Sequence, residues 1–166
     1  TYRYIFVCVD LYSRYTWAEA LRDKTNLNNV SLAMDQVLDD ISDKFPGRKV
    51  QAVISDNGGE EFQGRFSELL KQRHIKHIFT KSHSPNQNAI VERKNRELRR
   101  VLRSFAAAQV SPNWWVNLDK AVDVLNQSHV RTLGSAPDNA IREDADNPRH
   151  QRLVEKSQRA MTKLAQ

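Results

Sequence analysis

The sequence is poor in cysteine and in long apolar runs. Cys8 is the only cysteine among 166 residues, so a disulfide within the chain is excluded and a reducing compartment is expected. A zinc module built on several Cys and His ligands is excluded for the same reason. No apolar run approaches the roughly 18 to 20 residues of a membrane span, so no membrane partner is expected. The chain has no signal-peptide pattern and does not begin with Met, which suggests a fragment of a longer protein.

Composition and charge indicate a folded domain with an anionic partner. Hydrophobic residues make up 39% and charged residues 28%, which is typical of one soluble globular domain. The formal net charge is +6 and the isoelectric point about 9.6, which favours nucleic acid as the partner. The positive charge is concentrated, because residues 93–103 carry six Lys or Arg and one Glu. Four aspartates gather in the segment 35–43.

Hydrophobic periodicity predicts alternating strands and helices. The expected elements are strands 4–9 and 15–21 joined as an antiparallel hairpin, a helix over 27–45, a strand over 50–55, a helix over 60–73, a strand over 75–79, a helix over 89–108 and another from 112–113. This order predicts an α/β layer structure with parallel strand pairs beside the hairpin. After Pro137 the pattern decays, and residues 143–166 are expected to be a polar tail or linker.

Two acidic residues stand where a metal-dependent site needs them. Asp56 follows directly after the strand expected over 50–55, where open α/β sheets place ligand-binding groups. Glu92 lies in the first turn of the helix expected over 89–108. Each has an ordinary structural alternative, because Asp-Asn-Gly is also turn chemistry and a carboxylate at a helix N-terminus also complements the helix dipole. As a pair beside a cationic surface, they predict metal-assisted phosphoryl transfer on DNA.

The helix expected over 89–108 separates charged from apolar side chains. Successive residues of a helix are rotated by about 100° around its axis. Three arginines therefore point within roughly 40° of the direction of Glu92 and share its exposed side. These arginines are Arg96, Arg99 and Arg103. The opposite side, expected to face the core, carries Ile90, Leu98, Val101 and Phe105. Ion pairs within the helix are one use of the arginines, but one glutamate cannot neutralise three of them, so a polyanion is the expected partner.

Two motifs resemble the catalytic core of the DDE integrase family, which occurs in retroviruses, LTR retrotransposons and self-synthesising transposons of the Polinton-Maverick type. They are Asp56-Asn57-Gly58-Gly59-Glu60-Glu61-Phe62 and Val91-Glu92-Arg93-Lys94-Asn95-Arg96. The resemblance covers residues 1–142, including a closing segment from Asn126 to Pro137. Two departures from the family pattern are one additional residue before Phe62 and Ala89, which occupies a loop position where many relatives have Gly.

The resemblance implies an RNase H-like fold, with a mixed sheet flanked by helices, over a core of residues 1–142. It implies a polynucleotidyl transferase in which Asp56 and Glu92 bind Mg²⁺ or Mn²⁺ and catalyse 3′-end processing and strand transfer of element DNA into target DNA. The implied DNA-binding residues are Asn88, Asn95, Arg96, Arg99 and Arg103. A homo-oligomer working in the nucleus, or in a virion or pre-integration complex, is also implied.

The family uses three carboxylates, and the first is expected to be missing from this chain. Residues 7–15 resemble the family's later hairpin, so we interpret Asp10 as a turn residue that bonds nearby backbone amides. The alternative is that Asp10 substitutes for the first acid. The strand count favours the turn, because three antiparallel strands precede the first helix in the family and two are expected here. We therefore expect the first strand and its Asp to lie upstream of Thr1, and the chain as given to be inactive or severely impaired.

Two other functions remain open from the sequence. A domesticated relative would keep DNA binding or dimerisation without chemistry, whereas a plain RNase H-like nuclease would cut DNA without joining it. An Asp on a short strand before Thr1 would favour the enzyme over the domesticated module. Trp114 and Trp115 are expected to anchor the core or a dimer interface rather than to stack on bases.

Overall fold

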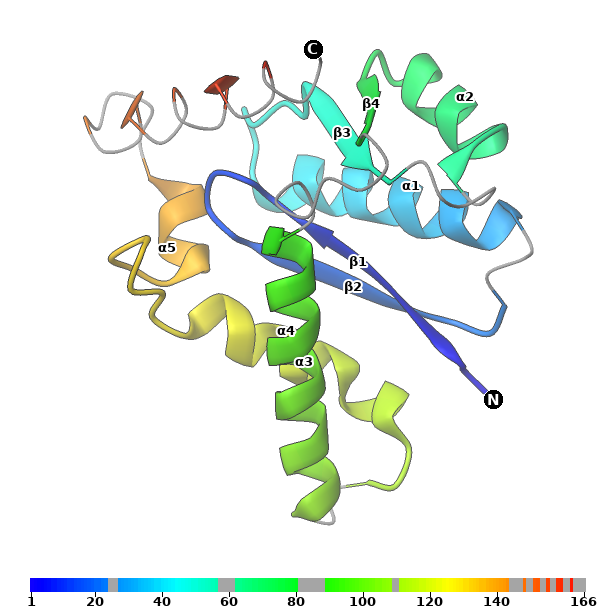
Figure 1. Ribbon diagram of the computed structural model, residues 1–166, viewed down its shortest axis with the longest axis vertical. Coiled ribbons are helices and arrows are strands. Elements are labelled where there is room, and N and C mark those ends of the chain that lie inside the picture. The colour runs from blue at the N-terminus through cyan, green and yellow to red at the C-terminus, as the bar shows by residue number, and fades with distance from the viewer. Residues whose placement is uncertain are drawn as a thin grey trace.

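The computed structural model describes residues 1–23, 27–56, 62–80, 89–108 and 111–143, with scattered residues beyond 147. Strands and helices alternate in the expected order (Figure 1). The elements are β1 (Tyr4–Val9), β2 (Thr16–Leu21), α1 (Leu27–Lys44), β3 (Ala52–Ser55), α2 (Arg65–Gln72), β4 (Lys76–Phe79), α3 (Ala89–Ala107), the 3-10 turn η2 (Trp114–Asn117), α4 (Leu118–Gln127) and α5 (Pro137–Arg142). No helix within these ranges is both long and apolar enough to cross a lipid bilayer.

β1 and β2 form the antiparallel hairpin that the sequence predicts, and every residue of β1 pairs with β2. Asp10 organises the turn between them. Its Oδ2 accepts hydrogen bonds from the Ser13 amide at 2.6 Å and from the Ser13 hydroxyl at 2.7 Å. Arg14 then adopts a left-handed conformation with φ of 63°, which reverses the chain into β2. The Asp10 carboxylate is therefore a turn-forming group, as the sequence indicates.

α1 covers one face of the hairpin, and the largest buried core joins it to β1, β2, α2 and the segment entering β4. Its acidic segment is engaged in structural contacts. Trp17 of β2 donates its indole N–H to Asp40 at 2.8 Å, and Arg73 at the end of α2 pairs with Asp35 and Asp39. These aspartates therefore hold α1 against its neighbours and do not form a separate ligand site.

α3 and α4 cover the opposite face of the hairpin, so the molecule is layered as α1, hairpin, then α3 with α4 (Figure 1). Leu98 of α3 and Ala121 of α4 are almost completely buried there. Trp114 packs against this core, which confirms its expected anchoring role. The Trp115 ring lies 5.7 Å from the ring of Tyr2, near the start of the chain.

β3 and β4 form a second sheet in which the two strands run parallel. The register pairs Val53 with His77 and Ser55 with Phe79. Among the described residues, no strand ladder joins this sheet to the hairpin. The expected α/β architecture is confirmed, but the mixed sheet is divided into two sheets of two strands each.

Two local predictions need correction. α2 begins at Arg65 rather than near residue 60, and residues 57–61 lie outside the described part. α5 forms where the sequence pattern decays, because Pro137 is a favourable first residue of a helix and Ala140 and Ile141 find buried positions against α4 and the α1 core. Most of residues 144–166 lie outside the described part, so the division into a core ending at 142 and a tail stays a prediction.

One buried side chain ties α4 to the hairpin. The Asn126 amide, which is 3% exposed, accepts a hydrogen bond from the Thr16 amide at 2.8 Å and donates one to the Thr16 carbonyl at 2.9 Å. The two residues are 110 positions apart in the sequence. A side-chain amide here replaces a strand partner that β2 would otherwise need at its first residue.

Replacement of Asn126 with alanine is therefore expected to lower the free energy of unfolding by about 2–4 kcal/mol, because two buried backbone groups of Thr16 lose their partners. Urea denaturation followed by circular dichroism measures this change. The matched control is Gln127→Ala, because Gln127 is exposed on the same helix. A loss for Asn126→Ala no larger than that of the control would contradict the assigned role.

Candidate active site and nucleic-acid interface

Asp56 stands at the carboxyl end of β3, where the chain leaves the sheet. Its side chain is exposed, whereas Ser55 before it is buried. The Ser55 hydroxyl donates a hydrogen bond of 3.2 Å to the main-chain oxygen of Asp56. Within the described residues, no hydrogen bond or ion pair occupies the Asp56 carboxylate. This carboxylate is therefore open to a ligand.

Glu92 lies in the first turn of α3, and its side chain is also exposed. No residue of the described ranges bonds or pairs with its carboxylate. In Figure 1 the first turn of α3 and the carboxyl end of β3 both lie in the upper half of the view, on either side of the carboxyl end of β1. This arrangement is compatible with a shared site, and the approach of the two carboxylates to one ion stays a prediction.

The start of α3 is also electrostatically coupled to the hairpin turn. Burial lowers the pKa of Arg14, the nearby Asp10 carboxylate opposes that effect, and the positive charge of Arg93 lowers the Arg14 pKa further. Arg93 directly follows Glu92, so the candidate catalytic glutamate belongs to a helix end that faces the turn after β1.

The donor atoms of Asp56 and Glu92 suit a hard divalent cation. Both supply carboxylate oxygens, which are the ligands that Mg²⁺ and Mn²⁺ prefer in proteins. Across the described part of the chain, no group of three or more His, Cys, Asp or Glu side chains is close enough to hold a metal. The carboxylate oxygens of Asp56 and Glu92 are thus chemically suited to such an ion, and their binding of one ion stays a prediction.

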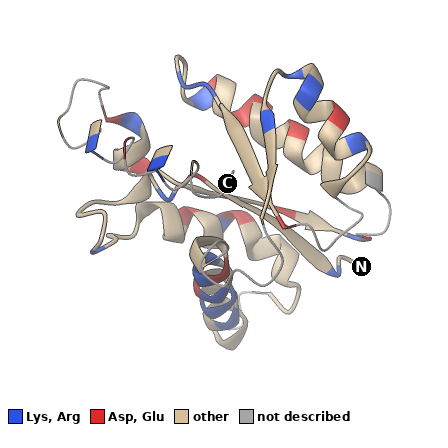
Figure 2. Ribbon diagram, turned by 45° about the horizontal axis from the view of Figure 1, so that its top comes forward, with Lys and Arg blue, Asp and Glu red and all other residues tan. Residues whose placement is uncertain are grey.

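The exposed side of α3 carries a set of arginines that we call the arginine ridge. It consists of Arg93, Arg96, Arg99, Arg100 and Arg103, all exposed. The ion pairs of the described residues include none of them, and the one ion pair within α3 joins Lys94 to Glu97. Figure 2 shows Lys and Arg repeating along this helix. A row of unpaired guanidinium groups is the surface expected for a polyanion.

The structure says less about the other two predicted DNA-binding residues, Asn95 and Asn88. Asn95 lies on α3 between Glu92 and Arg96 and is half-buried. Asn88 lies outside the described residues. The apolar side of α3 is confirmed at Leu98, which is 1% exposed, whereas Ile90 is only half-buried.

Lys94 was missed as an inward-facing residue. It is 5% exposed, and its Nζ lies 2.9 Å from Glu97 Oε2. The available signal was its position four residues before Leu98 and eight before Leu102, which places it on the buried stripe of the helix. A lysine fits there because its aliphatic stem can pack while its ammonium group pairs with Glu97.

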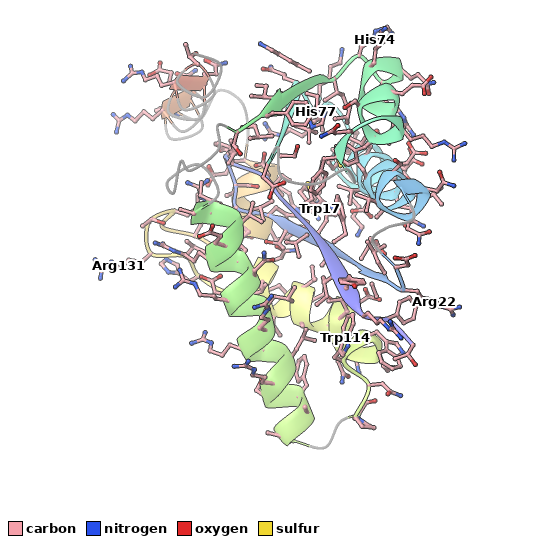
Figure 3. All side chains as sticks on the ribbon, turned by 45° about the vertical axis from the view of Figure 1, so that its right-hand side comes forward. Trp17, Arg22, His74, His77, Trp114 and Arg131 are labelled. Atoms are coloured by element: carbon pink, nitrogen blue, oxygen red, sulfur yellow. The ribbon has the colours of Figure 1, made fainter. Side chains whose placement is uncertain are left out.

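His77 was also missed, and it contacts Ser55, the residue before the candidate catalytic aspartate. Its Nε2 is 2.8 Å from the Ser55 hydroxyl, and its Nδ1 is 2.9 Å from the Ser67 hydroxyl of α2. Burial lowers the pKa of His77, which favours the neutral ring. Figure 3 shows His77 between the β3–β4 sheet and α2, with His74 at the outer end of α2. No sequence signal identifies His77, because its partners Ser55 and Ser67 are brought to it only by the folding of β3 and α2 around β4.

Comparison with known proteins identifies the family and the fold. A family model described as the integrase core domain matches residues 1–85, just over half of the chain. The Pol polyprotein of transposon RE2 from Arabidopsis thaliana is 30% identical over 115 residues, which cover 69% of this chain and 8% of that polyprotein. The chain thus spans less than a tenth of this relative.

Two solved structures have the same fold. The catalytic core domain of HTLV-2 integrase, in complex with magnesium, superposes with a TM-score of 0.66 at 21% identity, covering 82% of this chain and 83% of that chain. A simian T-cell lymphotropic virus intasome, in complex with a PP2A regulatory subunit, gives a TM-score of 0.75 at 16% identity, covering 87% of this chain and 50% of that chain. The fold is therefore RNase H-like, and the chain belongs to the integrase core domain family.

Proposed function

We propose that this chain is the catalytic core of a DNA integrase that processes 3′ ends and transfers DNA strands. The observation that carries the proposal is one helix, α3, that begins with an exposed carboxylate without a partner among the described residues and continues as a ridge of unpaired arginines. A metal-binding acid beside a phosphate-binding surface is what phosphoryl transfer on DNA requires.

In this proposal Asp56 and Glu92 hold Mg²⁺ or Mn²⁺, and the bound ion supplies activation of the attacking hydroxyl and stabilisation of the leaving oxygen. The chain's own residues orient the reactants. The arginine ridge binds the phosphates on one side of the reacting bond, and Asn95 offers an amide for hydrogen bonding close to Glu92. Water as the attacking group gives end processing, and the released 3′-hydroxyl as the attacking group gives strand transfer.

A third carboxylate is needed to complete the site, and Asp10 does not supply it in this proposal. Oδ2 of Asp10 accepts two hydrogen bonds from Ser13, which hold this side chain in the hairpin turn. β1 pairs only with β2 and β3 only with β4 among the described residues, so both strands keep an unpaired side. An extended segment that pairs with β1 and β3 would bring an aspartate level with Asp56. We therefore expect residues 1–166 to transfer strands poorly or not at all by themselves.

The proposal also includes assembly and location. The HTLV-2 core is described in dimeric and trimeric forms, and the simian virus protein is part of an intasome. By the same logic this chain works as a homo-oligomer that holds two DNA ends, in the nucleus or in a virion or pre-integration complex. Its DNA partners are the element ends and the target.

The test is a joining assay with Mg²⁺, a short duplex that mimics an element end and a supercoiled plasmid target. We expect joined products from a longer form of the chain, extended at Thr1 by a strand that carries an aspartate, and little or none from residues 1–166. Efficient joining by residues 1–166 would contradict the need for a third carboxylate. Cutting without joining by the longer form would instead support a nuclease. DNA binding without either reaction would support a domesticated binding module.

A further inference from the structure

We propose that His77 is a positioning residue for Asp56, acting through the Ser55 hydroxyl. The inference deepens the proposed function and rests on it, because it assigns a role toward the ion that Asp56 would hold. His77 touches neither the carboxylate of Asp56 nor the arginine ridge in the described contacts. Its effect passes along a chain of hydrogen bonds that ends at the Asp56 main-chain oxygen.

The chain of hydrogen bonds crosses three elements. It begins at Ser67 of α2, whose hydroxyl lies 2.9 Å from His77 Nδ1 on β4. His77 Nε2 lies 2.8 Å from the hydroxyl of Ser55 at the end of β3. The Ser55 hydroxyl reaches the Asp56 carbonyl oxygen at 3.2 Å. The main-chain oxygen of Asp56 is therefore contacted from inside the protein at the point where β3 leaves the sheet.

The number of available protons limits how these bonds can be arranged. Ser55 has one hydroxyl proton, so it can donate to Asp56 only if His77 Nε2 carries a proton and donates to Ser55. In the neutral ring Nδ1 is then bare and accepts the proton of Ser67. With the other tautomer, Ser55 donates to Nε2, and Ser67 donates to the Phe62 carbonyl at 3.3 Å. Only the first arrangement provides a hydrogen bond to Asp56.

The surroundings of the ring keep it neutral and in one orientation, as the first arrangement requires. Burial lowers the pKa of His77, so the ring is neutral at neutral pH. The Nε2–H tautomer is the one that the neutral ring of a free histidine side chain prefers. The Phe79 ring lies 4.1 Å from the His77 ring and the Phe66 ring 5.4 Å from it, so the imidazole is held in one plane between strand and helix. A ring fixed in this way keeps the Ser55 proton directed at Asp56.

Substitution of His77 offers a matched pair of variants. In His77→Gln the side-chain nitrogen takes the place of Nε2 and keeps the bond to Ser55. In His77→Asn the side-chain oxygen takes the place of Nδ1 and keeps only the bond to Ser67. Both variants lose the aromatic contacts equally. A merely structural histidine would therefore give equal effects, whereas a positioning histidine would give unequal ones.

The first measurement does not depend on activity or on an ion. Nitrogen-15 spectra of the folded chain are expected to show a protonated Nε2 and a bare Nδ1 at His77. The carbonyl carbon-13 shift of Asp56 is expected to move in His77→Asn and in Ser55→Ala, and to stay near the wild-type value in His77→Gln and Ser67→Ala. A protonated Nδ1 with a bare Nε2, or equal movement in the Gln and Asn variants, would overturn the proposal.

The second measurement uses Mn²⁺ alone as the probe, through paramagnetic broadening of the Asp56 and Glu92 signals. His77→Asn is expected to lower the Mn²⁺ affinity about tenfold, at the low end for partners that orient a metal ligand, and His77→Gln about twofold or less. Equal loss in both variants would again overturn the positioning role. Absence of broadening in the unsubstituted chain would refute the ion site of the proposed function, while the carbon-13 result would still decide the role of His77.

Discussion

Simultaneous replacement of Arg96, Arg99 and Arg103 with alanine is expected to lower the affinity for duplex DNA about a hundredfold at about 0.1 M salt. The three guanidinium groups are exposed and have no acidic partner among the described residues, so their full charge is available to phosphates. The first and the last of them are seven positions apart on α3, a rise of about 10 Å, which matches about three steps along one DNA strand. Fluorescence anisotropy with labelled duplexes of unrelated sequence measures the loss.

The salt dependence of DNA binding by the same variant tests the number of phosphate contacts directly. Each lost phosphate contact lowers the slope of log affinity against log salt by about 0.9, so three contacts lower it by about 2.7. The control removes three exposed lysines elsewhere, by Lys49→Ala, Lys71→Ala and Lys76→Ala, and lowers the formal net charge of +6 by the same amount. Equal losses in the two triple variants would mean that net charge, and not the arginine ridge, binds DNA.

Asp56→Asn is expected to weaken Mn²⁺ binding measured at Glu92 by at least about tenfold, and Glu92→Gln is expected to do the same at Asp56. The physical reason is that each carboxylate holds part of one ion, so removing either charge leaves a single weak ligand. Paramagnetic broadening of backbone signals reports both positions separately. Stability is expected to change little, because both side chains are exposed and make no described contact.

The control for this pair is Asp10→Asn. Because the Asp10 carboxylate is committed to Ser13, its replacement should disturb the hairpin turn and leave Mn²⁺ broadening at Asp56 and Glu92 unchanged. Loss of broadening in Asp10→Asn would identify Asp10 as the third ligand. Independent responses of Asp56 and Glu92 to each other's replacement would show that they do not share an ion.

The sequence predicts the elements of this fold well where a pattern is local. Alternation of apolar residues and a turn closed by Asp10 define the hairpin, and helical spacing defines α3 with its charged and apolar sides. α5 could not be predicted in this way, because six residues are too few to show a helical period and their burial depends on α4 and α1.

The same contrast between local sequence patterns and contacts made only on folding applies to the candidate site. Motif and spacing single out Asp56 and Glu92 because each stands at the end of a predictable element. His77 could not be recognised, because its partners Ser55 and Ser67 come from elements that only the folded chain brings together. Lys94 was overlooked because a lysine on a basic helix is ordinarily assigned to solvent, whereas tertiary packing turns this one inward.

The division of the sheet has a consequence for motion within the molecule. Asp56 belongs to the β3–β4 unit and Glu92 to the helix that packs on the hairpin, and no backbone ladder connects these two units among the described residues. The two units are therefore linked through the core that both share with α1 rather than through backbone hydrogen bonds, and amide exchange should distinguish their protection. Among the described residues, side-chain packing and not a strand ladder relates the two acids, and a further strand that paired with both units would fix their separation.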